Sequence, residues 1–235
     1  MREYKKSMET LLNLLLNMVY NLLNICNRCD IIKQKYLYKG GITMRTPFVI
    51  EFTGTPEAGK TTSITNVSNA LLSIGYKVSV LRESAEKLPK EIPKGIWDAN
   101  LWMHHQTQAG LIRAKYFKTD IVLVDRGLID SDFYGKKFLW EKECTEEEYQ
   151  QFRKLFIEEL FPDFVLALIV PPEIAIQRRG GEGRLVNEEY IRNYNKMFLR
   201  YYDSLTCPKE LIDTSEFSVY EMNQKVLGII KEALS

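Results

Sequence analysis

Gly54-Thr-Pro-Glu-Ala-Gly59-Lys60-Thr61 is the stretch of the sequence that decides the fold. It matches the pattern G-x-x-x-x-G-K-[ST], in which the glycines let successive backbone N–H groups point at phosphate oxygens. In this pattern the lysine reaches the β- and γ-phosphates of a nucleoside triphosphate, and the hydroxyl after it binds Mg²⁺. We therefore expect a phosphate loop that binds ATP with Mg²⁺, in which Lys60 and Thr61 take these two roles.

The residues on both sides of this phosphate loop fit the motif. The apolar run 48–52 predicts a buried strand, and apolar residues spaced three and four apart after Lys60 predict a helix. A helix that starts at the loop adds the positive end of its dipole to the phosphate site. Glu57 carries a negative charge, so we assign it no role. The residues expected to hold the nucleotide are Gly54, Thr55, Pro56, Ala58, Gly59, Lys60, Thr61 and Thr62, with Arg178 from later in the chain.

Strands and helices are predicted to alternate along the rest of the chain. This order indicates a parallel sheet with right-handed crossovers and helices on both faces. We therefore expect an α/β fold, a three-layer sandwich with the active site at the carboxyl ends of the strands. The further strands are expected at 77–81, 120–125, 164–170 and 210–213, and the further helices at 97–117, 128–140, 145–160, 188–205 and 218–234.

Two acidic positions lie where such a site is expected. Asp125 ends an apolar strand, and a carboxylate at this place holds Mg²⁺ through water in phosphate-loop enzymes. The alternative is that Asp125 caps the next helix. Glu83 follows the second strand and could accept the proton of an attacking hydroxyl. The alternatives are that Glu83 is a solvated loop glutamate or that Glu86 is the base. Arg126 is expected to contact the transferred phosphate or the acceptor.

A cluster of arginines lies on a glycine-rich segment after the fourth strand. Arg178 and Arg179 end a helix, glycines follow at 180, 181 and 183, and Arg184 precedes the next helix. Arginines on such a hinge suit a lid that closes over phosphates and excludes water. We predict catalytic roles for Arg179 and Arg184. The alternative is an exposed basic loop.

Several other side chains are left open between a functional and a structural role. Trp97, Trp102, Gln106 and Gln108 could stack on and hydrogen-bond a base, or the tryptophans could belong to the core. Phe133 and Tyr134 carry the same ambiguity. Asp130 and Ser131 belong either to the site or to the surface of a helix.

Residues 1–43 differ from the rest of the chain. Their net charge is +4, whereas the net charge of the whole chain is +1. An apolar run from Leu11 to Cys26 is interrupted by asparagines at helical spacing. The run is shorter than the roughly 20 residues that span a bilayer, and no small-residue cleavage site follows it. We therefore divide the chain into an extension, 1–43, and a phosphate-loop domain, 44–235. The extension is either an accessory helix or sequence upstream of a true start at Met44.

The composition excludes few classes of function. A net charge of +1 gives no whole-chain argument for binding nucleic acid or an anionic membrane. Four scattered cysteines suit a reduced cytoplasmic protein rather than a disulfide framework. Cys26 and Cys29 form a lone C-x-x-C without two further ligands for zinc.

From Met44 onward the chain resembles the thymidylate kinase and deoxynucleoside kinase group of P-loop kinases. The resemblance rests on the phosphate loop, the Glu83 segment, Asp125-Arg126, the strand between Pro162-Asp163 and Pro171-Pro172, and the arginines of the lid. It implies a five-stranded parallel sheet with the loop strand beside the Asp-Arg strand. It also implies transfer of the γ-phosphate of ATP to a nucleoside or nucleoside monophosphate, with Mg²⁺.

The sequence departs from this group in two places. Ser84 stands where a proline usually follows the glutamate of deoxynucleoside kinases, and Gly127-Leu-Ile-Asp130-Ser131 differs from both subgroups. The second stretch resembles kinase-like ATPase domains that carry Asp-Arg-Gly and Asp-Ser, so the acceptor stays open.

Three functions are therefore considered. The first is a nucleoside or nucleotide kinase acting on a small-molecule acceptor, and the second is a kinase of another small metabolite. The third is an acceptor-independent P-loop ATPase or nucleotide switch. Asn195-Lys196 is followed by Met197 and Phe198, so the Asn-Lys-x-Asp element that GTPases need is absent. The oligomeric state, including a homodimer, is left open.

Overall fold

A computed structural model describes residues 36–39, 42–181 and 187–234, and only the backbone of 36–45. The predicted helix around Leu11–Cys26 and the Cys26–Cys29 pair lie outside the described residues. Strand β1 (Tyr36–Lys39) pairs antiparallel with strand β2 (Ile42–Arg45). The division of the chain at residue 43 stays a prediction.

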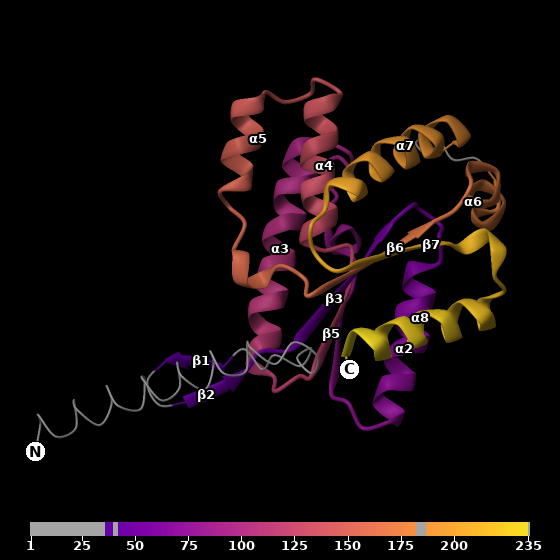
Figure 1. Cartoon of the computed structure of the whole chain (residues 1–235). Helices are drawn as coiled ribbons and strands as arrows, with labels where there is room; N and C mark the ends of the chain where they lie inside the picture. Colours follow the sequence, from indigo (N-terminus) through magenta and orange to yellow (C-terminus); the bar gives the residue numbers. More distant parts are fainter. Residues whose placement is uncertain (1–35, 40–41, 182–186, 235) are drawn as a thin grey trace, which may run out of the picture. The chain divides into compact units, whose positions relative to one another are not determined.

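A parallel five-stranded sheet forms the centre of the fold, as predicted (Figure 1). Its strand order is β4-β5-β3-β6-β7. The loop strand β3 lies beside β5, so the neighbour relation implied by the resemblance is confirmed. The strands are β3 (Phe48–Gly54), β4 (Val78–Leu81), β5 (Ile121–Asp125), β6 (Phe164–Ile169) and β7 (Lys209–Asp213).

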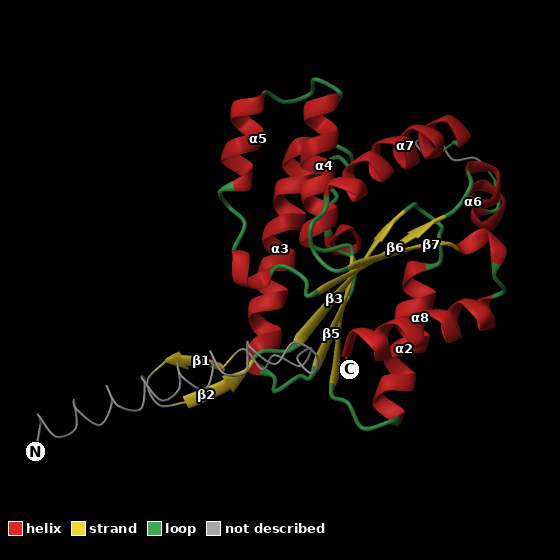
Figure 2. Cartoon of the chain, viewed as in Figure 1, coloured by secondary structure: helices red, strands yellow, loops and turns green. Residues whose placement is uncertain are grey.

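Helices cover both faces of this sheet (Figure 2). On one face α2 packs against β3, β4 and β5, and on the other α4 packs against β3 and α3 beside it. This is the expected three-layer sandwich. The helices are α2 (Lys60–Ser73), α3 (Trp97–Tyr116), α4 (Leu128–Trp140), α5 (Glu146–Arg153), α6 (Pro172–Arg179), α7 (Glu188–Ser204) and α8 (Val219–Leu234). Short 3₁₀ turns are η1 (Ser84–Lys87), η2 (Glu158–Leu160) and η3 (Thr214–Glu216).

An aromatic cluster fixes α4 and α7 over the sheet. Phe133 on α4 is fully buried and contacts the rings of Tyr194 and Phe198 on α7 at 5.1 and 5.3 Å between centroids. Such edge-on aromatic pairs add about 0.5–1.5 kcal/mol beyond the area they bury. Phe133 is therefore a core residue rather than a residue that stacks on a base.

The helix predicted at 145–160 is wrong in its second half. The α5 helix begins at a Thr145–Glu148 capping box but ends at Arg153, and η2 follows. The reason is Gln108 on α3, whose amide donates to the Leu155 carbonyl at 3.1 Å and accepts from the Ile157 N–H at 3.2 Å. These bonds satisfy backbone groups that a continuous helix would have paired, which lets the chain turn back against α3.

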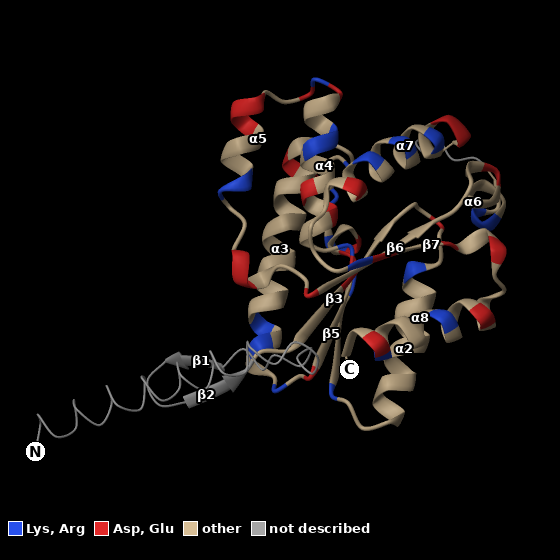
Figure 3. Cartoon of the chain, in the orientation of Figure 1, with Lys and Arg blue, Asp and Glu red and all other residues tan. Residues whose placement is uncertain are grey.

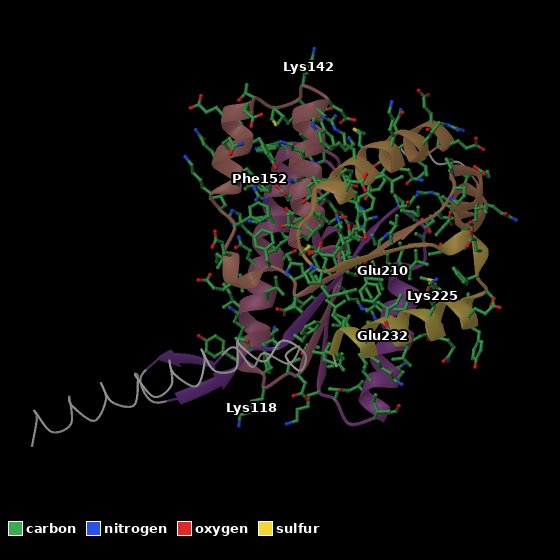
Figure 4. All side chains as sticks on the ribbon, in the orientation of Figure 1. Lys118, Lys142, Phe152, Glu210, Lys225 and Glu232 are labelled. Carbon is green, nitrogen blue, oxygen red and sulfur yellow. The ribbon has the colours of Figure 1, made fainter. Side chains whose placement is uncertain are left out.

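Two of the four tryptophan and glutamine positions on α3, Trp97 and Gln108, are also explained by this packing. Phe152, which points from α5 toward α3 in Figure 4, contacts Trp97 at 5.3 Å and His104 at 5.0 Å between ring centroids. Trp97 and Gln108 thus serve the contact between α3 and α5 and are not base-recognition residues.

Charges of both signs are interspersed over the described residues, and glutamates gather at the first turns of α5 and α7 (Figure 3). Acidic residues at these positions complement the positive ends of the helix dipoles. Within the part of the chain that the structure describes, no helix combines the length and the apolar character that crossing a membrane requires.

Candidate active site

The phosphate loop connects β3 to α2 in the expected way. Gly54 has a φ of +111°, and a Cβ built on it would lie 2.1 Å from the Leu168 carbonyl oxygen of β6. Only glycine meets both conditions. Gly59 has a φ of +84° and caps α2, so the backbone curls around the position where phosphate oxygens would lie.

Lys60 bends back over its own loop. Its Nζ donates to the Thr55 carbonyl at 2.6 Å and to the Gly54 carbonyl at 3.3 Å. Burial of the ammonium, with Arg126 nearby, lowers the pKa of Lys60 to about 7. A triphosphate would supply the negative charge that this buried cation lacks.

Thr61 and Asp125 meet at the carboxyl edge of the sheet. The Thr61 hydroxyl donates to Asp125 Oδ2 at 2.6 Å, and Asp125 Oδ1 is buried without a hydrogen-bond partner among the described atoms. An orphaned carboxylate oxygen beside a hydroxyl suits a Mg²⁺ ion whose other ligands are water and phosphate. Among the described residues, no group of three or more His, Cys, Asp or Glu side chains is placed to hold a metal ion.

Arg126 follows in the turn between β5 and α4. Its φ is +57°, a left-handed conformation that few non-glycine residues adopt. NH1 of its guanidinium donates to Asp130 at 2.8 Å, and Nε lies 3.4 Å from Glu83. Burial opposes the charge of Arg126, but neighbouring acidic groups, with Asp130 foremost, raise its pKa above the ordinary value. Asp130 is buried and belongs to the site rather than to a helix surface.

Glu83 lies at the end of β4, opposite the turn. Burial raises the pKa of Glu83, and the Arg126 charge opposes that rise. The ion pair with Arg126 holds the Glu83 side chain in place. The side chain is still 36% exposed, and it lines the pocket. Glu86, the rival from the sequence, is exposed and does not line the pocket.

Two polar residues of β3 that the motifs did not single out reach the same turn. Glu51 is 1% exposed and accepts hydrogen bonds from the backbone N–H groups of Gly127, Ile129 and Asp130, at 2.8, 3.0 and 2.8 Å. Thr53, two residues further along the strand and on the same face, donates to Asp130 at 2.9 Å.

The α7 helix also takes part, which the sequence did not reveal. The Tyr194 hydroxyl donates to the Gly54 carbonyl at 3.0 Å and accepts from Arg126 at 3.3 Å. Asn195 accepts from the Thr55 hydroxyl at 2.6 Å and donates to the Val170 carbonyl at 2.9 Å. A single helical turn thus links the phosphate loop, the β6 end and Arg126.

The predicted lid is described only in part. Arg178 donates to the Thr214 hydroxyl and carbonyl, both at 2.8 Å, and Arg179 NH1 lies 3.8 Å from the Glu57 carboxylate. Both arginines line the same pocket as the loop. Arg184 lies outside the described residues, so a closing lid stays a prediction.

One pocket of about 1100 Å³ collects these groups. Lys60 and Thr61 line one part of it, and Glu83, Arg126 and Asp130 line another. The α3 helix contributes residues at helical spacing that the sequence reading missed, Asn100, Met103 and Thr107, while Tyr134 on α4 joins them. Asp125 lies behind Thr61 rather than in the lining.

Known proteins resemble this chain in sequence and in fold. A thymidylate kinase of Caldanaerobacter subterraneus is 28% identical over 162 residues, 63% of this chain and 76% of the relative. A thymidylate kinase of Caldicellulosiruptor saccharolyticus is 25% identical over 207 residues, 81% of this chain and 98% of the relative. No protein-family model matches the sequence.

The solved structures give the same picture of the fold. Deoxyadenosine kinase from M. mycoides with bound dATP superposes with a TM-score of 0.60 at 22% identity, over 78% of this chain and 99% of that one. The same enzyme with bound dCTP gives 0.61 at 22% identity, over 79% and 100%.

The sheet order and the loop define a phosphate-loop protein with the architecture of the nucleoside kinases. In sequence the chain is similar to these two thymidylate kinases, and in fold it is similar to deoxyadenosine kinase.

Proposed function

We propose that this protein transfers the γ-phosphate of ATP to the hydroxyl of a nucleoside or to the phosphate of a nucleoside monophosphate. The observation that carries the proposal is that the phosphate loop and the Glu83–Arg126 pair open into one pocket. A triphosphate on the loop and an acceptor beside Glu83 would therefore share the space in which phosphoryl transfer needs both.

The residues divide the work between the two sides of the pocket. An acceptor oxygen forms the new bond to the γ-phosphorus while the bond to the β-phosphate oxygen breaks and ADP leaves. For a hydroxyl acceptor, Glu83 takes the proton, and its raised pKa brings it nearer to neutral pH, where a general base is most effective. Lys60 and Arg126 stabilise charge on the transferred group.

Thr61 and Asp125 would hold Mg²⁺, which neutralises charge on the β- and γ-phosphates when bound. Arg178, Arg179 and Arg184 would close over the phosphates and exclude water. The acceptor we propose is a free small molecule. The homodimer and the cytoplasmic location stay predictions from the sequence.

ADP release measured with a panel of nucleosides and nucleoside monophosphates tests this function. Release that depends on one of these acceptors is expected, and the acceptor that supports it identifies the subgroup. ADP release at the same rate without any acceptor would instead indicate an ATPase, and turnover only with an unrelated metabolite would indicate a different kinase.

A matched pair of variants tests the base. Glu83→Gln is expected to lower kcat by about 100-fold or more, the usual contribution of a positioned general base. Glu86→Gln, three residues away on the exposed side of η1, is expected to leave kcat within about twofold of the unchanged protein. Equal effects of the two substitutions would remove Glu83 from the mechanism.

A further inference from the structure

Glu51 is a buried carboxylate that the proposed chemistry does not use. Its side chain is 1% exposed, and both oxygens accept hydrogen bonds from the first turn of α4. Oε1 accepts from Gly127 and Asp130, and Oε2 accepts from Ile129. These are the backbone donors that a helix start leaves without a partner inside the helix.

The carboxylate replaces a cap that α4 does not have. The N-cap of α4 is Gly127, which has no side chain to accept a hydrogen bond. A Cβ at Gly127 would lie 2.4 Å from Glu51 Oε2, so the missing side chain is what lets the carboxylate approach. Burial raises the pKa of Glu51 to about 7, and the three backbone hydrogen bonds oppose that rise because they favour the charged form.

The turn that Glu51 holds is the one that carries Arg126 and Asp125. Arg126 has the left-handed φ of +57°, and such a conformation persists only where the surroundings hold it. Glu51 binds the N–H immediately after Arg126 and the N–H of its partner Asp130, and Thr53 binds the Asp130 carboxylate. The strand that leads into the phosphate loop therefore also sets the position of the opposite catalytic arginine.

We infer that Glu51 is a positioning residue for phosphoryl transfer, acting through the Gly127 turn to place the Arg126 guanidinium over the transferred phosphate. The inference rests on the proposed function for its catalytic part. Glu51 does not line the pocket and touches neither nucleotide nor acceptor, so its effect is expected in kcat rather than in the KM for ATP.

Glu51→Gln keeps the shape of the side chain but places an NH₂ group against N–H donors. It is expected to lower kcat by about tenfold to 100-fold, the scale of a misplaced catalytic group, with the KM for ATP changed by less than about twofold. Asp132→Asn is the matched control. Asp132 is a buried carboxylate on α4, the helix whose first turn Glu51 binds. Its partners are Tyr149, Tyr201 and Arg153, away from the turn.

The Asp132→Asn control distinguishes a loss of activity caused by a misplaced Arg126 from one caused by lower stability of the fold. Both substitutions are expected to lower Tm, but only Glu51→Gln is expected to lower kcat. Equal losses of kcat in the two variants at a temperature where both are folded, or a loss confined to KM, would overturn the inference.

A double-mutant cycle tests the route through Arg126. In an Arg126→Lys background the guanidinium that Glu51 is thought to place is already gone. Glu51→Gln is then expected to lower kcat by less than about twofold further. Fully independent effects would show that Glu51 acts through something other than Arg126.

Hydrogen exchange of the unchanged protein keeps the inference testable if Glu51→Gln does not fold. The amides of Gly127, Ile129 and Asp130 are expected to exchange only through global unfolding, because each is bonded to a buried carboxylate. Exchange through a local opening of much lower free energy would contradict a fixed turn. This measurement needs no substrate, so it separates a failure of the turn from a failure of the proposed kinase activity.

Discussion

The phosphate loop and the β5–α4 turn, Asp125 to Asp130, contribute to one pocket but are held in different ways. The loop combines contacts within a few residues of itself, such as Lys60 to the Thr55 carbonyl and Ala58 N–H to Thr55 at 3.3 Å, with bonds from Tyr194 and Asn195 on α7. The turn is fixed by Glu51 and Thr53, 76 to 79 residues earlier, and by Tyr194, 68 residues later.

The two regions therefore differ in how much their conformation depends on residues distant in the sequence. A loop that is held partly by its own residues loses only some of its supports when one remote contact is removed. A remotely held turn keeps its shape only when several strands and helices are assembled around it. We therefore expect substitutions in the loop to affect activity more than stability, and substitutions around the turn to affect both.

The largest effect is expected from Lys60→Ala. Removing the cation that would contact the γ-phosphate is expected to lower kcat by about 100- to 1000-fold, as for other preorganised electrostatic contacts. Stability is expected to change little, because the loss of the two hydrogen bonds to the loop carbonyls is offset by the removal of a charge that burial disfavours. Parallel kinase assays and thermal unfolding check both parts. A variant that unfolds instead would show that the fold depends on the Lys60 bonds.

Gly127→Ala is expected to come next and to act on stability. Its new Cβ would lie 2.4 Å from Glu51 Oε2 and 3.0 Å from Val124, so we expect a loss of about 1–3 kcal/mol in the free energy of unfolding. Gly228→Ala in α8 is the control, since a Cβ there meets nothing within 4 Å and alanine is the better helix former. Urea unfolding of both variants measures the contrast, and equal stabilities would contradict the tight approach of Glu51.

Thr53→Val removes one remote support of the turn and leaves the others. The Asp130 carboxylate loses the donor at 2.9 Å but keeps Arg126, so we expect about 1 kcal/mol of destabilisation. Thr65→Val removes an exposed hydroxyl bond on α2 and is expected to stay within about 0.5 kcal/mol of the unchanged protein. Equal free energies of unfolding for the two variants would mean that the Thr53 bond contributes nothing to the turn.

The smallest effect at neutral pH is expected from His104, which lies behind the turn, 3.3 Å from Ser131 Oγ. Burial lowers the pKa of His104 to about 4, whereas the unfolded chain takes up the proton near 6.5. The unfolded state therefore binds more protons between these values, and stability falls as the pH drops from 6.5 toward 4.

His104→Leu isolates this term. The free energy of unfolding of the unchanged protein minus that of the variant is expected to decrease as the pH falls through this window, and to level off above 6.5. A difference that does not vary with pH would show that His104 is protonated equally in both states.

What could be predicted from the sequence follows the same division. The phosphate loop, the strand before it and the helix after it were predicted because their signals lie in one continuous stretch, 48–73. Asp125, Arg126 and Glu83 were expected at one crevice because parallel strands end at the same edge. The structure places Arg126 and Glu83 in one pocket, with Asp125 behind Thr61.

The supports of the turn could not be predicted in this way. A glutamate inside the apolar run 48–52 was a signal in itself, because a buried carboxylate must find donors, but nothing local identifies them as the N–H groups of α4. Tyr194 bonds Arg126 of the turn, and Tyr194 and Asn195 also bond Gly54 and Thr55 of the loop, 140 residues away. The sequence offered only the helical setting of these two residues. The end of α5 was misjudged for the same reason, since it depends on Gln108.

The left-handed backbone of Arg126 has a consequence for engineering this protein. Glycine or asparagine would fit a φ of +57° better than arginine does, so either substitution is favoured by the backbone. A selection for thermal resistance alone would thus be drawn to the residue that the chemistry most needs. Position 126 should be held constant in any such library, because backbone strain at this position favours glycine or asparagine whereas the proposed catalysis needs arginine.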